Sequence, residues 1–211
     1  MEHKPPLSFA VVILAAGKSR RMGQTKLLLS WGEGSVLAHL VRQWTACHAA
    51  QSALVSGPDA KDLHDELDRL RFAEADRIEN PAPDRGMFSS IQCAAAWPHW
   101  KSTISHWIIA LGDQPHLRPQ TIEALIQFGA ENPSRICQPL RHGRYRHPVL
   151  LPQPVFLQLK DSALPDFKAF LEAHATQRSG FECDDDGLDL DMDTPADYKR
   201  LRELYRSRAA S

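Results

Sequence analysis

Residues 9–17 read Phe-Ala-Val-Val-Ile-Leu-Ala-Ala-Gly, and this stretch decides the fold class. Its six leading residues are all apolar, which is typical of a strand that is buried on both faces and belongs to a parallel sheet. A second such run, Trp107 to Leu111, ends at Gly112-Asp113. Ligands of open α/β sheets bind beyond the carboxyl ends of the strands. We therefore expect the functional site where these two strands end.

Strand and helix patterns alternate along the first 130 residues. Short apolar runs predict strands at 53–55 and 77–79, and helical periodicity predicts helices at 35–48, 63–70, 89–97 and after Pro119. The remainder predicts strands at 135–137 and 148–151, a turn at 177–180, and helices at 167–174 and from Pro195. Asp59 and Thr194 are the expected helix caps. We predict an α/β fold with one domain over residues 1–211, its core at about 7–206. The expected sheet is doubly wound, Rossmann-like and mostly parallel, with helices on both faces.

Composition limits the class of partner. The 211 residues carry 25 Lys and Arg against 26 Asp and Glu, a formal net charge of −1, which does not suit a protein that binds nucleic acid through bulk positive charge. The four cysteines are scattered, as in reduced cytosolic proteins. No signal peptide and no apolar run of membrane-spanning length is visible. We expect a cytoplasmic protein without nucleic-acid or membrane partners.

The loop after the first strand has the properties of a phosphate site. Gly17 and Gly23 permit close backbone approach, and successive backbone N–H groups form a concave anion site. Four cations surround the loop: Lys18, Arg20, Arg21 and Lys26. The spacing is neither that of a P-loop nor G-x-G-x-x-G. From the residues alone, a solvated basic turn is an equally good interpretation.

The run from Leu14 to Lys26 resembles L-A-A-G-x-S-x-R-M-G-x-x-K, the signature of nucleotidyltransferases that act on the molybdenum cofactor. These enzymes belong to the nucleotide-sugar pyrophosphorylase-like (nucleotide-diphospho-sugar transferase) superfamily, and the resemblance implies that this loop wraps a nucleoside triphosphate. The implied nucleotide-binding residues of the loop are Leu14, Ala15, Ala16, Gly17, Ser19, Gly23 and Lys26. Lys26 and Arg21 are the implied catalytic cations, stabilising the triphosphate and the leaving pyrophosphate.

Two acidic motifs complete the resemblance. Gly112-Asp113-Gln114-Pro115 matches the family's G-D-Q-P, in which the aspartate binds Mg²⁺ and is catalytic. Residues 191–198, Asp-Met-Asp-Thr-Pro-Ala-Asp-Tyr, are similar to D-I-D-T-P-E-D-Y. One or both of Asp191 and Asp193 would join Asp113 in holding Mg²⁺ or Mn²⁺, since alternating residues of a strand share a face.

Two further stretches match more loosely. Residues 80–91 resemble N-P-x-x-x-x-G-M-x-x-S-L, which implies that Asn80, Gly86 and Ser90 lie near the base and ribose. His147-Pro148-Val149-Leu150 resembles G-H-P-V-L-F, which borders the acceptor, so Arg144 and His147 are the candidate acceptor-binding residues. A solvated basic hairpin is the alternative for that stretch.

Two features do not follow the family pattern. The G-D-x-G-A-R stretch of relatives that act on the molybdenum cofactor is not found, and residues 160–171 stand in its place. Residues 182–193 resemble a degenerate EF-hand loop, but Glu opens it, Asp closes it, and no helix is predicted before it. An acidic turn is the preferred interpretation of Asp184 to Asp186.

The motifs together predict an Mg²⁺-dependent nucleotidyltransferase that releases pyrophosphate. The first interpretation is a CTP:molybdopterin cytidylyltransferase. By analogy, Ala16 and Gln24 favour CTP, because family members that use CTP tend to read L-A-A-G where GTP users read L-A-G-G. The alternatives are a guanylyltransferase, a transferase for another phosphorylated acceptor such as a sugar phosphate, and a non-catalytic nucleotide-binding or cofactor-delivery protein. A molybdoenzyme or its maturation chaperone is the implied protein partner.

Overall fold

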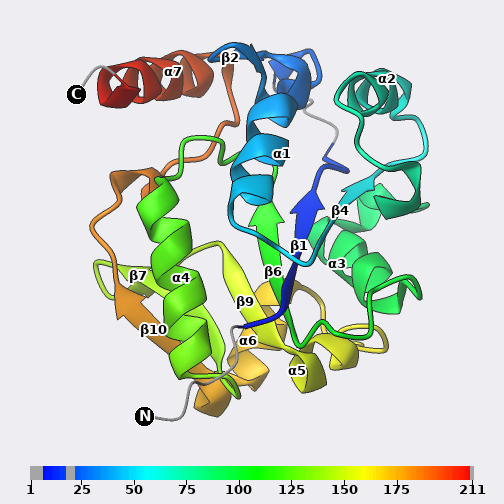
Figure 1. Ribbon diagram of the computed structural model, residues 1–211, viewed down its shortest axis with the longest axis vertical. Coiled ribbons are helices and arrows are strands. Elements are labelled where there is room, and N and C mark those ends of the chain that lie inside the picture. Colours follow the sequence, from blue (N-terminus) through cyan, green and yellow to red (C-terminus); the bar gives the residue numbers. More distant parts are fainter. Residues whose placement is uncertain (1–6, 18–21, 210–211) are drawn as a thin grey trace.

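The protein is built around one mixed β-sheet. Figure 1 shows this sheet behind α1 and α4, with β10 on the left and β4 on the right. This computed structural model describes residues 7–17 and 22–209. The main path of the sheet has the strand order β10-β7-β9-β6-β1-β4-β5, and β8 pairs with β7. Its strands are β1 (Phe9–Leu14), β4 (Gln51–Ser56), β5 (Arg77–Glu79), β6 (His106–Leu111), β7 (Ile136–Arg141), β8 (Arg144–Tyr145), β9 (Val149–Pro152) and β10 (Arg178–Glu182). A separate hairpin pairs β2 (Ser30–Trp31) with β3 (Gly34–Ser35).

Strand β1 lies at the centre of the sheet because both of its faces are apolar. It pairs in parallel with β4 on one side and with β6 on the other. Val11 and Ile13 pack into the core on one face, and Ala10 and Val12 pack into the core on the other face. The uninterrupted apolar run at residues 9–14 is therefore the sequence signature of this two-sided burial.

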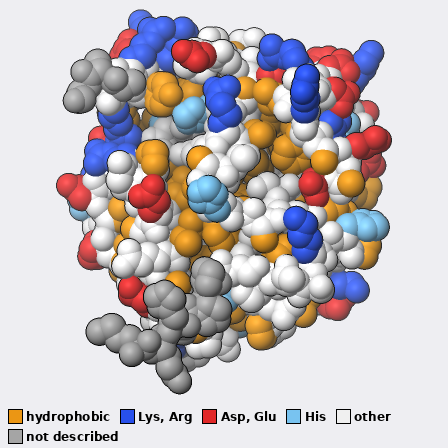
Figure 2. All heavy atoms as spheres, viewed as in Figure 1, with side chains coloured by type: hydrophobic (Ala, Val, Ile, Leu, Met, Phe, Trp, Pro, Cys, Tyr) orange, Lys and Arg blue, Asp and Glu red, His pale blue; other side chains and the backbone are white. Residues whose placement is uncertain are grey.

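Helices cover both faces of the sheet. One face packs against α1 (Val36–Ala46), α2 (Lys61–Arg69), α4 (Pro119–Glu131) and α7 (Pro195–Ala209). The other packs against α3 (Met87–Ala96), α5 (Gln153–Gln158) and α6 (Phe167–Ala173). Short 3₁₀ turns connect them: η2 (Lys26–Leu28), η3 (Glu74–Asp76), η4 (Pro83–Arg85), η5 (Ala175–Gln177) and η6 (Asp186–Asp189). Figure 2 shows charged side chains mostly around the rim of the α1/α4 face and apolar or uncharged ones in its middle.

The predicted fold class is confirmed, and two local predictions are wrong. Strand β9 runs antiparallel to β6 and β7, so the sheet is mostly but not wholly parallel. The turn expected at 177–180 is instead the start of β10, which pairs in parallel with β7. Asp59 does not cap α2, because that helix begins at Lys61 after Ala60 and has no side-chain cap. Within the described residues, no helix is both long and apolar enough to cross a membrane.

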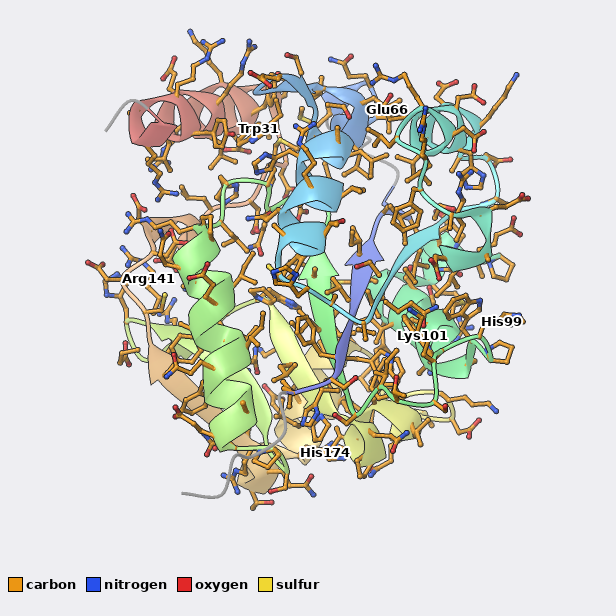
Figure 3. The ribbon with its side chains drawn as sticks, viewed as in Figure 1. Trp31, Glu66, His99, Lys101, Arg141 and His174 are labelled. Carbon is orange, nitrogen blue, oxygen red and sulfur yellow. The ribbon has the colours of Figure 1, made fainter. Side chains whose placement is uncertain are left out.

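The last helix, α7, is fixed against the hairpin by aromatic contacts. The Tyr198 hydroxyl donates a hydrogen bond to the Ser30 carbonyl at 2.5 Å, and the Trp31 and Tyr205 rings lie 5.1 Å apart. Figure 3 shows Trp31 where α7 meets the hairpin and α1. Thr194 caps the helix as predicted: its hydroxyl accepts from the Asp197 N–H, and Asp197 accepts from the Thr194 N–H. This docking brings the acidic segment before α7 to the end of β6.

Candidate active site

A cavity of about 250 Å³ lies beyond the ends of β1 and β6. It brings together three motifs that are far apart in the sequence, as predicted: the glycine loop, the start of α3 and the end of β6. The cavity is lined by Leu14, Ala15, Ala16, Gly17, Lys26, Leu27, Pro83, Gly86, Met87, Ser90, Leu111, Gly112 and Asp113. Arg21 and Ser19, together with Lys18 and Arg20, lie outside the described residues, so their predicted roles stay predictions.

Gly112 is a residue whose role the sequence analysis missed. A Cβ at this position would lie 2.6 Å from the Leu14 carbonyl oxygen, inside any permitted contact. The Gly112 N–H instead donates to that carbonyl at 3.1 Å. Glycine therefore keeps the ends of β1 and β6 in contact and delivers Asp113 to the mouth of the glycine loop. The sequence did carry a signal for this role, because Gly112 precedes Asp113 in the G-D-Q-P motif. That motif was interpreted only for its aspartate.

Lys26 and Asp113 form the central ion pair of the cavity. Their Nζ and Oδ2 atoms lie 2.7 Å apart, and the same ammonium lies 3.7 Å from Oδ1 of Asp193. The other carboxylate oxygen of Asp113, Oδ1, is buried and accepts no hydrogen bond within the described residues. A buried anionic oxygen without a donor is costly, so the site has room for another positive or hydrogen-donating group there.

Asp191 and Asp193 flank Met192 in the segment before α7. Met192 is fully buried, and this segment is not part of the sheet. Gln114 Nε2 donates to Asp191 Oδ1 at 3.3 Å. Asp191 stays accessible to solvent, yet partial burial and then the charges of Asp113 and Asp193 raise the pKa of its carboxyl. The three carboxylates thus lie close enough for the charges of Asp113 and Asp193 to act on Asp191, and their joint hold on a metal stays a prediction.

A metal-binding set is not preassembled, although its chemistry is present. Within the described residues, no three His, Cys, Asp or Glu side chains are arranged to hold a metal ion. The Lys26 ammonium lies between Asp113 and Asp193, where it supplies positive charge to the cluster. The donors are carboxylate oxygens, the ligands that Mg²⁺ and Mn²⁺ prefer, and the free Asp113 Oδ1 suits such a cation.

The predicted glycines meet different physical needs, and Gly23 lines neither this cavity nor the larger one beside it. Gly23 and Gly86 adopt positive φ angles of 66° and 90°, which residues with side chains disfavour. Gly17 has no such conformation, and no described atom lies within 4 Å of where its Cβ would be. A side chain at Gly17 would instead project into open space beside the cavities that this residue lines. The described protein gives no packing reason for glycine at position 17.

A second cavity, of about 650 Å³, adjoins the first and shares four lining residues with it: Ala15, Ala16, Gly17 and Pro83. Its other walls come from the loops after β4 and β5 and from the start of α2. Three carboxylates line this second cavity: Asp59, Asp62 and Asp84. The glycine loop thus has a cavity with the Lys26–Asp113 pair on one side and a cavity lined by three carboxylates on the other.

Asn80 has a different place from the predicted one. Its side chain is buried and lines neither cavity. The amide donates to the hydroxyls of Ser89 at 2.8 Å and Ser90 at 2.9 Å, and its oxygen accepts from the Ala82 N–H at 2.9 Å. Asn80 therefore supports the turn that presents Gly86 and Ser90, and the predicted contact with the nucleotide is not available to it in this geometry.

The predicted acceptor residues lie outside both cavities. Arg144 is exposed on β8. His147 lies beside β6, where burial lowers its pKa to about 4 against the raising effects of a backbone hydrogen bond at Ile109 and the Asp113 charge. The imidazole is therefore neutral near pH 7, and its buried Nδ1 has no hydrogen-bond partner within the described residues. Of the two, His147 is electrostatically coupled to the active-site carboxylate.

The preferred interpretation of Asp184 to Asp186 as an acidic turn agrees with the structure, because arginines pair with these residues. Asp184 pairs with Arg141 at 3.0 Å, and Asp186 with Arg118 at 3.2 Å and with Arg208. Residues Asp186–Asp189 form a 3₁₀ turn rather than an open loop. The basic hairpin is neutralised in the same way: Asp189 pairs with Arg141 at 2.9 Å and with Arg146 at 2.5 Å. Figure 3 shows Arg141 at the periphery of the molecule, on the side of β7 and β10.

Comparison with known proteins identifies relatives of matching length. A family model described as "MobA-like NTP transferase domain" matches residues 11–178. The molybdenum cofactor cytidylyltransferase of Escherichia coli (strain K12) is 28% identical over 198 residues, which cover 92% of this chain and 95% of that protein.

Solved structures agree with the fold. The crystal structure of Rv0371c from Mycobacterium tuberculosis H37Rv aligns with a TM-score of 0.69 and 25% identity, over 93% of this chain and 98% of that one. A structure of Rv0371c in complex with manganese aligns with a TM-score of 0.66 and 23% identity, over the same shares of the two chains.

Proposed function

The chain belongs to the MobA-like NTP transferase domain family, and from that premise we propose that it transfers the cytidylyl group of CTP to molybdopterin with release of pyrophosphate. It is a nucleotidyltransferase, and the family acts in molybdenum cofactor biosynthesis. One observation carries the proposal furthest. The Lys26–Asp113 pair lines the same cavity as the backbone of Ala15 to Gly17, so cationic, anionic and backbone donor groups face one space.

The residues of this cavity suit an attack by the acceptor's terminal phosphate on the α-phosphate. A phosphate nucleophile is ionised near neutral pH, so the site has no need of a strong general base, and positioning and charge neutralisation supply the rate. Gly17 admits the triphosphate close to the backbone, and Lys26 neutralises charge on it; Arg21 has the same proposed role. A divalent cation held by Asp113 with Asp191 and Asp193 would supply neutralisation of phosphoryl charge and a fixed geometry.

The larger cavity is the proposed place of the nucleoside. Its carboxylates, Asp59, Asp62 and Asp84, are hydrogen-bond acceptors suited to the exocyclic amine of a base. Cytosine and guanine both carry such an amine, so this lining suits either base. The preference for CTP rests on Ala16, by resemblance to family members that use CTP. Gly86 and Ser90, at the start of α3, lie on the smaller cavity, where we propose that they meet the ribose and phosphates.

A second candidate is a transferase for another phosphorylated acceptor, such as a sugar phosphate. The observation that favours it is local. Where relatives carry G-D-x-G-A-R, this chain forms α6, whose Phe167 and Phe170 are buried in the core. The acceptor side of the site is therefore built from different residues.

Mg²⁺ or Mn²⁺ is the proposed cation, and the proposed compartment is the cytoplasm. The four cysteines, Cys47, Cys93, Cys137 and Cys183, are all unpaired thiols, which suits a reducing compartment. A molybdoenzyme or its maturation chaperone is the proposed recipient of the product.

A pyrophosphate-release screen tests the proposal. The full chain is incubated with Mg²⁺ and each of the four nucleoside triphosphates, with and without molybdopterin. We expect pyrophosphate release only in the mixture that contains both CTP and molybdopterin. Release with GTP would replace the base assignment, and release with a sugar phosphate as acceptor would select the second candidate. Nucleotide binding without release in any combination would contradict catalysis and favour a cofactor-delivery protein.

A further inference from the structure

Asp185 is the most enclosed carboxylate among the described residues that the proposed reaction does not use. Its side chain is 1% exposed. Oδ2 accepts from the backbone N–H of Arg118 at 2.9 Å and from the Thr121 hydroxyl at 2.9 Å. Oδ1 accepts from the Gly187 N–H at 2.9 Å and from Arg208 Nη2 at 3.2 Å. The four donors belong to the start of α4, the 3₁₀ turn η6 and the helix α7.

The donors at the start of α4 tie Asp185 to the loop that begins with Asp113. His116 of that loop is buried, and its Nε2 hydrogen bonds to the Gly187 carbonyl at 2.9 Å. The His116 carbonyl in turn accepts from Arg208 Nη1 at 2.9 Å. Residues 113–118 are thus bound to the acidic turn at several points, with Asp185 in the middle.

The same turn leads directly to Asp191 and Asp193, the two carboxylates proposed to act with Asp113. Leu188 and Met192 are buried, so the chain from Asp185 to Asp193 is anchored at two places between these ends. The Gln114–Asp191 hydrogen bond is a further link between loop 113–118 and segment 185–193. We therefore expect a substitution of Asp185 to alter the distance between Asp113 and the segment that carries Asp191 and Asp193.

We propose that Asp185 is a positioning residue, whose carboxylate fixes loop 113–118 against segment 185–193 and so sets the spacing of Asp113 from Asp191 and Asp193. The inference rests on the proposed function, because those three carboxylates are the proposed holders of the divalent cation.

A carboxylate suits this position better than a neutral isostere. Burial raises the pKa of Asp185, but the hydrogen bonds from Arg118, Thr121 and Gly187 and the Arg208 charge outweigh burial and leave the pKa below its ordinary value. An asparagine would present an NH₂ group to one set of these donors and leave buried N–H or O–H groups unpaired. Asp185→Asn therefore removes the positioning with little change of shape.

The experiment measures Mn²⁺ binding to the full chain by the electron paramagnetic resonance signal of free Mn²⁺, alongside the KM for CTP. For Asp185→Asn we expect the Mn²⁺ dissociation constant to rise about tenfold, as for other residues that orient metal ligands, with KM for CTP within about twofold. The matched control is Asp184→Asn, the same chemical change at the adjacent, solvent-exposed carboxylate, which should leave both quantities unchanged.

A milder variant covers the case in which Asp185→Asn unfolds. Thr121→Val deletes one donor to the carboxylate at constant shape, and we expect about a two- to fourfold rise in the Mn²⁺ dissociation constant. Folded variants that bind Mn²⁺ like the wild type would overturn the inference, as would an equal loss of CTP affinity.

The wild type separates the two claims. A wild-type chain that binds Mn²⁺ but releases no pyrophosphate contradicts the proposed function alone, and the variants still decide the positioning role. A wild-type chain that does neither overturns both claims.

Discussion

Two neighbouring groups of aspartates differ in how the protein balances their negative charge. The arginine-bound group, Asp184, Asp185, Asp186 and Asp189, pairs with Arg118, Arg141, Arg146 and Arg208. The second group, called the cavity group, is Asp113, which lines the smaller cavity, with its neighbours Asp191 and Asp193. Lys26 is the cation that the described residues place against Asp113 and Asp193.

The pKa shifts of Asp185, Asp189 and Asp191 follow this division. Burial raises the pKa of Asp185, but its donors outweigh it and the net shift is downward, and the Arg146 hydrogen bond lowers that of Asp189. Burial and the charges of Asp113 and Asp193 raise that of Asp191. Aspartates whose charge is matched inside the protein belong to the fold, whereas aspartates that repel one another beside a cavity have the electrostatics of a site for a cation from outside.

The largest expected effect is on turnover, from a charge deletion in the cavity group. Asp113→Ala should lower kcat by about 10³-fold, the scale on which loss of a preorganised electrostatic group acts, while the thermal melting curve stays cooperative. Asp184→Ala, from the arginine-bound group, should leave kcat within about twofold, since its carboxylate lies in solvent. Pyrophosphate release measures both. Wild-type turnover in Asp113→Ala would contradict the catalytic role that separates the cavity group from the arginine-bound group.

The next effect is on stability, from a charge deletion in the arginine-bound group. Asp185→Ala should lower the free energy of unfolding by about 3 kcal/mol, because it leaves buried donors and the Arg208 charge without a partner. Urea denaturation followed by circular dichroism measures the loss. A loss below about 1 kcal/mol would show that water replaces the carboxylate at little cost.

The pH dependence of stability sharpens the same contrast. Because the pKa of Asp185 is lowered by folding, its stabilisation is fully present above the ordinary aspartate pKa of about 3.9 and is lost as pH falls through the lower folded value. The stability gap between wild type and Asp185→Asn should therefore be constant from pH 5 to 7 and narrow below about pH 4. Urea titrations at several pH values test it, and a gap that widens on acidification would reverse the sign assigned here.

The smallest expected effect has the opposite sign. The pKa of Asp191 is raised, so its ionisation opposes folding once the pH rises above its folded pKa. Without added metal, Asp191→Asn should raise the free energy of unfolding slightly, by no more than about 0.5 kcal/mol, because the side chain is accessible to solvent. Melting temperatures at pH 7 with a chelator measure the change. A clear loss of stability would place Asp191 with the arginine-bound group.

The sequence predicted the elements that carry their own signal. The run at residues 9–14 shows two-sided burial directly, and Thr194-Pro195 marks the start of α7. Strand β10 gives no such signal, because Arg178-Ser-Gly-Phe-Glu is polar and contains a glycine. Its glycine is explained by neighbours in the sheet: a Cβ at Gly180 would lie 2.6 Å from the Leu140 side chain of β7 and 2.8 Å from the Tyr145 ring of β8.

Within the site, motifs predicted which carboxylates meet but not how charges are shared. Asp189 and Arg141 are 48 residues apart in the sequence, so nothing local shows that one neutralises the other. Asn80 was placed on the nucleotide because its motif lies near the base in relatives, whereas its hydrogen bonds to Ser89 and Ser90 exist only once α3 has formed. Ion-pair and hydrogen-bond partners that tertiary packing brings together therefore could not be predicted from sequence patterns alone.

Two glycines of the cavity, Gly17 and Gly112, differ in what the protein around them requires. Gly112 is required by the polypeptide itself, since any larger residue collides with the Leu14 carbonyl. Gly17 meets no described atom that would exclude a side chain, so a library randomised at both positions and screened for folding alone should retain glycine at 112 and drift at 17. Screening the same library for catalysis should restore glycine at 17. We therefore expect glycine at position 17 to be required for the proposed triphosphate and glycine at position 112 to be required for the packing of β1 against β6.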